Sequence, residues 1–150
     1  MAVIKRFEDF EIWQLARELS KNTHFLIKNT EKLSKDFSLK DQMKRSSGSV
    51  MDNIAEGFGR GGNKEFIMFL SISNGSNQEY KSQLYRCLDY EYIDKIVFDE
   101  YYELADKIGK KMTSFIQYLS QSNYKGEKYR KNKSTNLVEE PFVVYETFED

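Results

Sequence analysis

Apolar residues recur along most of the chain at alternating steps of three and four positions. This period places them on one face of an α-helix, where they can pack against neighbouring helices. Four series show it: Ile12, Ala16, Leu19, Thr23 and Leu26; Leu39, Met43, Val50 and Ile54; Phe66, Phe69, Ser73, Ser76, Tyr80, Leu84 and Cys87; and Phe98, Tyr101, Ala105, Ile108, Met112, Phe115 and Leu119. The pattern predicts four long amphipathic helices.

The connections between these helices are short, near residues 31–38, 58–63 and 90–97. A helix of about 20 residues is about 30 Å long, and short loops between such helices force antiparallel neighbours. The chain has one proline, Pro141, which suits long uninterrupted helices. We therefore predict an all-α domain over residues 1–123, an antiparallel up-down-up-down four-helix bundle.

Small residues and helix-end signals mark the two middle helices. Ser38, followed by Asp41, is predicted to cap the second helix. Mid-helix glycine costs about 1 kcal/mol relative to alanine, so a compensating contact is expected. Small residues are dense in both helices: Ser46, Ser47, Gly48 and Ser49 in the second, and Ser71, Ser73, Gly75 and Ser76 in the third. They predict a close approach of these two helices.

The stretch "NIAEGFGRGGNKEF" contains Gly57, Gly59 and Gly62, which spell the dinucleotide-binding pattern G-x-G-x-x-G. That pattern works only where it follows a strand and opens a helix. Here the preceding "SSGSVMDNIAE" has the character of a helix. The glycines therefore predict a helix end at Gly57, a turn and a new helix start near Asn63, with no bound cofactor.

Residues for catalysis are scarce. The chain has one histidine, His24, and one cysteine, Cys87, which falls on the apolar series of the third helix and is predicted to be a buried thiol. A di-iron bundle needs Glu-x-x-His pairs, but Lys21 stands three residues before His24. We predict no catalytic residue, no metal or cofactor and no small-molecule substrate, and so no enzyme.

Charge and composition place the protein by default in a reducing cytoplasm. The 23 Lys and Arg residues balance 24 Asp and Glu residues, so binding to nucleic acid would need a local basic patch. A single cysteine excludes an internal disulfide framework. No apolar run approaches the roughly 18 residues of a membrane span, and the charged start "MAVIKRFEDFEIWQ" does not resemble a signal peptide.

Four basic residues are candidates for phosphate contact, on the second helix and around the glycine turn. They are Lys44, Arg45, Arg60 and Lys64. Gathered on one surface, they would form an anion-binding patch. The alternative is an ordinary solvated face, because Asp41 and Arg45 have the spacing of an i, i+4 helix pair. Both interpretations remain open from spacing alone.

Residues 124–150 differ from the rest of the chain. "YKGEKYRKNK" (Tyr124–Lys133) has five basic residues and one acid, whereas "NLVEEPFVVYETFED" (Asn136–Asp150) has five acids and no base. We predict a C-terminal extension made of a flexible basic linker and an acidic tail with a short apolar core. The alternatives are a disordered tail and a strand that docks on a neighbouring subunit.

Two stretches resemble the 23S rRNA intervening sequence proteins: "FEDFEIWQLARELS" (Phe7–Ser20) and "LKDQMKRSSGSVMDNIAEGFGRGGNKEFIMFLSISNGSNQEYKSQL" (Leu39–Leu84). With the closing helix, the resemblance covers about residues 7–120. The matching positions are Trp13, Gln14, Ala16, Gln42, Met43, Arg45, Ser49, Asn53, Ile54, Ala55, Glu56, Gly57, Phe66, Phe69, Leu70, Gly75, Ser76 and Glu79. The family's usual Phe-Pro pair before the second helix is missing, since "KDFSLKDQ" keeps only Phe37.

The resemblance implies a four-helix bundle that assembles as a ring-shaped homopentamer and carries no enzymatic activity. It also implies a link to RNA or to a nucleoprotein partner such as a reverse transcriptase, because a related accessory protein serves diversity-generating retroelements. A purely structural or protein-binding oligomer is the alternative, favoured by the near-neutral charge. A structural or interface role is predicted for Asn53, Glu56, Gly57, Gly75 and Ser76.

Overall fold

The computed structural model describes residues 3–122 and 138–139. Four long helices form the domain, and a short helix and a single 3-10 turn accompany them. The elements in chain order are β1 (Val3–Ile4), η1 (Phe7–Asp9), α1 (Glu11–Asn29), α2 (Glu31–Lys35), α3 (Phe37–Gly59), α4 (Asn63–Asp89), α5 (Lys95–Gln121) and β2 (Val138–Glu139). The predicted all-α bundle is confirmed, with α2 added in the first connection.

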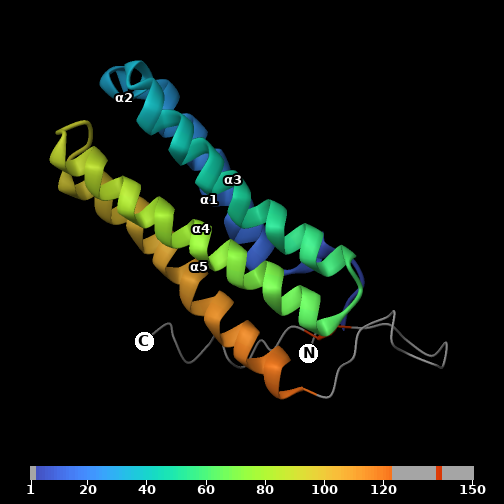
Figure 1. The fold of residues 1–150 in the computed structure, drawn as a ribbon. Helices are drawn as coiled ribbons and strands as arrows, with labels where there is room; N and C mark the ends of the chain where they lie inside the picture. Colours follow the sequence, from blue (N-terminus) through green and yellow to red (C-terminus); the bar gives the residue numbers. More distant parts are fainter. Residues whose placement is uncertain (1–2, 123–137, 140–150) are drawn as a thin grey trace.

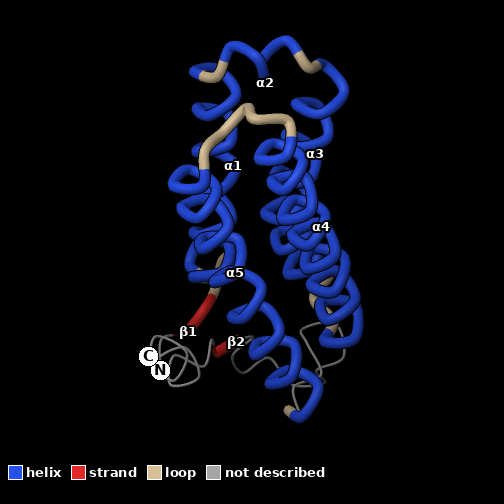
Figure 2. The backbone as a smooth tube through the Cα atoms, turned by 90° about the vertical axis from the view of Figure 1, so that its left-hand side faces the viewer, coloured by secondary structure: helices blue, strands red, loops and turns tan. Residues whose placement is uncertain are grey.

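Consecutive long helices run antiparallel, and the bundle is elongated along their common direction (Figure 1). The contacting pairs are α1 with α3, α3 with α4, α4 with α5, and α1 with α5, and α3 packs most extensively against α4. Figure 2 shows α2 and the turn between α4 and α5 at one end of the bundle and the two short strands at the other. None of the described helices is long and apolar enough to cross a membrane.

An aromatic cluster fills the core at the strand end of the bundle. Phe10, Phe66 and Phe115 are almost completely buried, and their ring centroids lie 5.4–5.7 Å apart. Such tilted and edge-to-face pairs add to the free energy of burial. The sequence pattern identified Phe66 and Phe115 but placed Phe69 beside them, whereas the structure buries Leu70 and leaves Phe69 only partly covered.

Serine hydroxyls join α3 to α4. Ser49 and Ser76 share a hydrogen bond of 2.8 Å, Ser73 donates to the carbonyl oxygen of Val50 at 2.6 Å, and Ser46 donates to Gln83. The predicted close approach of these helices is therefore made by the serines. Two of the predicted glycines, Gly48 and Gly75, take no part in it, because a Cβ at either position would have nothing within 4 Å.

Gly57 is the glycine that close packing requires. A Cβ at this position would lie 2.6 Å from the Cβ of Phe69 and 3.2 Å from the ring of Phe66. The prediction that Gly57 ends the second helix was wrong, because α3 continues to Gly59 and the left-handed residue of the turn is Gly61, with φ 76°. Gly57 therefore serves packing between helices, and Gly61 serves the chain reversal.

The predicted cap of α3 was also wrong. Asp36, not Ser38, precedes the helix, and its carboxylate accepts from the backbone N–H of Leu39 at 3.0 Å. The second oxygen of Asp36 accepts from the hydroxyl of Tyr92 at 2.9 Å. Helix α2 ends at Lys35, so Asp36 is the single residue between α2 and α3 and takes the N-cap position of α3.

Only two residues of the predicted C-terminal extension are described. Val138 and Glu139 form β2, which pairs antiparallel with β1 of the same chain, Val3 opposite Glu139 and Ile4 opposite Val138. The rest of residues 124–150, including the predicted linker and most of the acidic tail, lies outside the described residues.

Candidate functional site

The basic residues predicted to contact phosphate fall into two separate groups. Lys44 and Arg45 lie on the exposed surface of the first half of α3, whereas Arg60 follows its end and Lys64 lies in the first turn of α4. Fifteen residues separate Arg45 from Arg60, which corresponds to about 22 Å along a helix. The structure does not gather the four into one patch.

Both arginines already contact an acid on their own helix. Arg45 pairs with Asp41 at 3.0 Å, and Arg60 pairs with Glu56 at 2.8 Å and lies over the ring of Phe69. Exposed i, i+4 pairs of this kind contribute only about 0.3–0.5 kcal/mol. The pairs therefore lower the local positive charge without fixing the guanidinium groups firmly.

The residues predicted to be structural lie mainly along the contact of α3 with α4. The Asn53 side chain donates to the carbonyl oxygen and the hydroxyl of Ser49, both at 2.8 Å, and Ser49 in turn bonds to Ser76. A shallow groove of about 280 Å³ runs along this contact. It is lined by Gln42, Arg45, Ser46, Ser49, Ser76, Glu79 and Gln83. The predicted residues Arg45 and Ser76 thus share one groove, whereas Gly75 is exposed on the outer face of α4.

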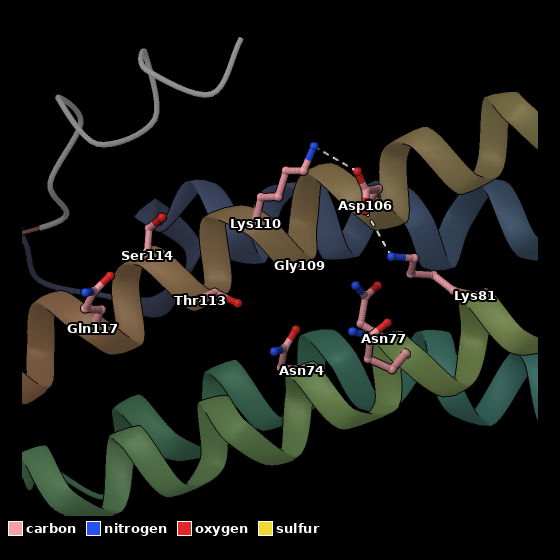
Figure 3. Close-up of a pocket in the computed structure, with 10 residues that line it drawn as sticks. Asn74, Asn77, Lys81, Asp106, Gly109, Lys110, Thr113, Ser114 and Gln117 are labelled. Atoms are coloured by element: carbon pink, nitrogen blue, oxygen red, sulfur yellow. Dashed lines mark hydrogen bonds and ion pairs between the residues drawn. The ribbon is translucent and has the colours of Figure 1, made fainter. Parts of the chain in front are cut away.

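A second groove, between α4 and α5, was not predicted. It has a volume of about 300 Å³, and nearly all the residues that line it are of polar types (Figure 3). Its lining residues are Asn74, Asn77, Gln78, Lys81, Asp106, Gly109, Lys110, Thr113, Ser114 and Gln117.

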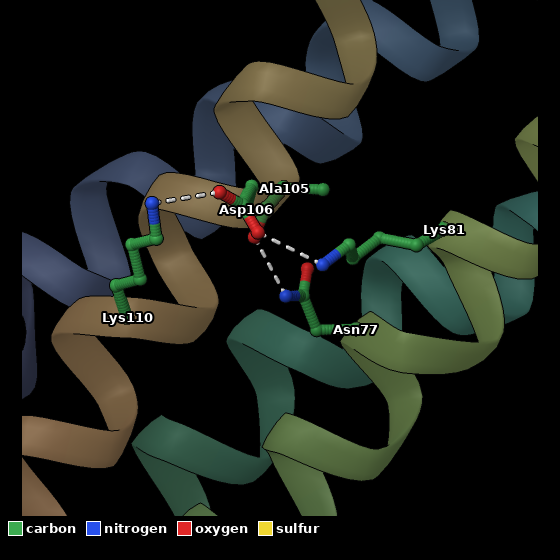
Figure 4. Close-up of polar contacts among 5 residues, drawn as sticks. All are labelled: Asn77, Lys81, Ala105, Asp106 and Lys110. Carbon is green, nitrogen blue, oxygen red and sulfur yellow. Dashed lines mark hydrogen bonds and ion pairs between the residues drawn. The ribbon is translucent and has the colours of Figure 1, made fainter.

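Three charged side chains form a compact cluster at one end of this groove (Figure 4). Asp106 accepts from Lys81 at 3.0 Å with one oxygen and pairs with Lys110 at 3.1 Å through the other. The hydrogen bond from Lys81 lowers the pKa of the Asp106 carboxyl. Burial alone would lower the pKa of Lys81, but its hydrogen bonds to Asp106 and to Tyr102 outweigh burial and raise it.

The floor of the groove holds two asparagines beside Gly109. Asn77 is 1% exposed and donates through Nδ2 to the carbonyl oxygen of Ala105 at 2.7 Å. This bond fixes the amide orientation, so Oδ1 of Asn77 faces away from that carbonyl. Within the described part of the chain, the Oδ1 atoms of Asn74 and Asn77 are buried and have no hydrogen-bond partner. A Cβ on Gly109 would lie 3.2 Å from Nδ2 of Asn77, so glycine makes room for this amide.

The groove could have been found from a second period in the sequence. Asn74, Asn77 and Lys81 follow each other at steps of three and four, as do Asp106, Gly109 and Thr113. Residues with this spacing share a helix face. Apolar periodicity does not reveal these residues, because each set lies just beside an apolar series and carries no hydrophobic signal of its own.

The cluster predicts a specific dependence of stability on pH. Because the pKa of Asp106 is lower in the folded state, its contribution to stability is present above the unfolded value of about 3.9 and is lost as the pH falls through the folded value. We expect Asp106→Asn to be less stable than the wild type at neutral pH and to lose less stability below about pH 4. Chemical denaturation at several pH values measures the free energy of unfolding of the wild type and of Asp106→Asn. Parallel dependences on pH for the two proteins would contradict the stabilising role of the Asp106 carboxylate.

The residues considered for catalysis do not converge. Cys87 is buried as predicted and lies 3.4 Å from the sulfur of Met43, and burial raises the pKa of its thiol to about 12. His24 is exposed on α1. Within residues 3–122 and 138–139, no group of three His, Cys, Asp or Glu side chains is placed to hold a metal ion.

Comparison with known proteins gives a matching family and a similar fold. The sequence model of the 23S rRNA-intervening sequence protein family matches residues 8–114. A crystal structure from Bacteroides thetaiotaomicron VPI-5482, a protein of unknown function from the S23 ribosomal protein family, is similar with a TM-score of 0.67 and 24% identity, over 71% of this chain and 98% of that one. Comparison with curated proteins gave no match. The chain therefore belongs to the 23S rRNA-intervening sequence protein family.

Proposed function

We propose that this protein is a non-enzymatic helical scaffold of the cytoplasm that assembles from identical copies, with a pentamer as the assembly. The observation that carries the proposal is the outer face of α4. Met68 and Ile72 lie one turn apart on this face, and their side chains are 51% and 48% exposed. Large apolar side chains that share one exposed face are typical of a surface that binds another protein.

Gly75 adds to this face. It follows Ile72 by three residues, lies inside a long helix, and has nothing within 4 Å of the position of a Cβ. A mid-helix glycine costs about 1 kcal/mol relative to alanine, and no contact within the described chain offsets this cost. A second copy could approach the backbone closely at this position. The pentameric state itself comes from the family resemblance.

A role in binding RNA or a nucleoprotein partner is the finer part of the proposal. It is supported by the exposure of Lys44, Arg45, Arg60 and Lys64 and by the weakness of the two arginine ion pairs. In a symmetric ring, every subunit would present the same two pairs of basic residues. This repetition compensates for the small number of basic residues in each copy.

We expect RNA binding to weaken steeply with salt, because phosphate contacts release counterions. Replacing Lys44, Arg45, Arg60 and Lys64 together by alanine should reduce affinity and also flatten the salt dependence. Fluorescence anisotropy with single-stranded RNA at several salt concentrations measures both quantities. The matched control is a chain in which Lys21, Lys28, Lys32 and Lys35 are replaced instead. Equal losses in the two variants, or no binding at low salt, would leave the alternative of a purely structural or protein-binding oligomer.

A further inference from the structure

We propose that the surface formed by the end of α1, by α2 and by the start of α3 docks on an anionic lipid membrane. We call it the α2 surface, and its residues are Lys21, Phe25, Lys28, Lys32, Lys35 and Phe37. This docking goes beyond the scaffold role and depends neither on RNA binding nor on the number of copies. Two protruding phenylalanines, the local charge and the form of the surface support it.

Two phenylalanines of the α2 surface are largely exposed. Phe25 is 66% exposed and Phe37 is 73% exposed. Phe25 precedes α2 by six residues and Phe37 follows it by two, and Figure 2 shows α2 joining the neighbouring ends of α1 and α3. Both side chains therefore protrude at the same end of the bundle. Large apolar side chains exposed near one another are typical of a surface that binds a protein or a membrane.

The α2 surface is basic, although the chain as a whole is nearly neutral. Residues 21–40 contain five lysines against two acids, and so carry a local charge of +3, whereas the whole chain carries −1. Both acids are already engaged, because Glu31 pairs with Lys35 at 2.7 Å and Asp36 accepts from the backbone of Leu39 and from Tyr92. The lysines that form no ion pair within the described part of the chain are Lys21, Lys28 and Lys32.

Lysines flank each phenylalanine. On α1, Lys21, Phe25 and Lys28 follow each other at steps of four and three and share one exposed face. On α3, Nζ of Lys40 lies 4.4 Å from the centroid of the Phe37 ring. A lysine stem can lie along apolar material while its ammonium group stays in water. This arrangement matches an anionic bilayer, where ammonium groups meet lipid phosphates and apolar side chains enter the layer below them.

The form of the surface favours a bilayer over other anionic partners. Neither of the two grooves described above includes Phe25 or Phe37 among its lining residues. Single-stranded nucleic acid is typically held in a basic groove, and a protein partner would have to supply a pocket for each ring. A fluid bilayer takes up protruding side chains without a preformed pocket, so it fits a surface of this form.

A second exposed apolar pair at the same end of the bundle provides an internal control. Tyr90 is 52% exposed and Ile96 is 79% exposed, and both lie at the turn between α4 and α5. Residues 89–100 contain five acids and one lysine, so an anionic membrane repels this side. We therefore expect Phe25 and Phe37 to enter the lipid and Tyr90 and Ile96 to stay in water.

Co-sedimentation of the full chain with vesicles of equal parts phosphatidylcholine and phosphatidylglycerol tests the docking. We expect binding that weakens with added salt and that is absent with vesicles of phosphatidylcholine alone. Replacing Phe25 and Phe37 together by alanine should weaken binding by about tenfold, because two rings lose their burial in lipid. Replacing Tyr90 and Ile96 by alanine should leave binding unchanged. Equal losses in the two variants, or equal binding to the two kinds of vesicle, would overturn the proposal.

A second pair of variants tests the charge. The first replaces by alanine Lys21, Lys28, Lys32 and Lys35, and the second replaces Lys44, Arg45, Arg60 and Lys64. The first should weaken vesicle binding by on the order of a hundredfold, since each lysine near an anionic surface contributes about fivefold. The second should cause a much smaller loss.

The two variants have opposite roles in the vesicle and RNA experiments, so either proposal can fail without the other. Unchanged vesicle binding by the first variant would overturn the docking on lipid. If that variant lost RNA binding instead, the α2 surface would belong to a nucleic acid.

Discussion

Replacing Ile72 by aspartate is expected to dissociate the assembly into monomers while leaving the helix content unchanged. Ile72 is half exposed on the outer face of α4, so a polar side chain there costs the single chain little. Full burial of an exposed isoleucine contributes about 1.5–3 kcal/mol, and about half of this, roughly 0.7–1.5 kcal/mol per contact, remains to be gained at a half-exposed residue. An unpaired carboxylate in its place adds a further penalty. Every 1.4 kcal/mol is a tenfold change in affinity. The apolar loss is therefore about threefold to tenfold in affinity per contact, and the penalty of the buried charge adds to it.

Sedimentation velocity measures this effect directly. The matched control is Ser71→Asp, which adds the same charge to the neighbouring residue, where the serine hydroxyl bonds only within its own helix to Ile67. We expect Ser71→Asp to keep the assembly. If both variants remain assembled, the outer face of α4 is not the interface. If both dissociate, added charge on α4 rather than the apolar contact is the cause.

The second large effect is expected at Gly57. In Gly57→Ala the new methyl group would lie 2.6 Å from the Cβ of Phe69, an atom next to the backbone of α4. Since that atom cannot move without its helix, α3 and α4 must separate. Overpacking of this kind costs typically about 1–3 kcal/mol. Alanine's higher helix propensity returns up to about 1 kcal/mol, so we expect a net loss in the free energy of unfolding.

Gly48→Ala is the matched control, since it is the same substitution in the same helix. A Cβ at Gly48 meets nothing within 4 Å, so the change should stabilise the chain by about 0.5–1 kcal/mol. Urea denaturation of the two variants should therefore give shifts of opposite sign. Shifts of the same sign would contradict the packing of Gly57 against Phe69.

The helices could be predicted because their apolar residues carry the helical period. The series on α5 is buried at Phe98, Ala105, Ile108, Met112, Phe115 and Leu119, and only Tyr101 is partly exposed. Several buried residues were missed because they are polar. Asn77 and Gln83 are buried on α4 without any hydrophobic signal, and α2 interrupts a connection that looked like a loop.

The candidate sites were harder to predict than the fold for a related reason. Lys44 and Arg45 looked close to Arg60 and Lys64 in the sequence, yet a helix converts fifteen residues into about 22 Å. Conversely, Lys81 and Asp106 lie 25 residues apart and meet at 3.0 Å because α4 and α5 pack side by side. Local motifs do not show such contacts, whereas a comparison of polar periods on adjacent helices does.

The most direct test of the proposed scaffold is the mass of the full chain in solution, measured by light scattering over a range of concentrations. The account predicts a single species with about five times the chain mass of 17.8 kDa, stable on dilution. A species of 17.8 kDa at every concentration would contradict self-assembly and, with it, the role proposed for the outer face of α4.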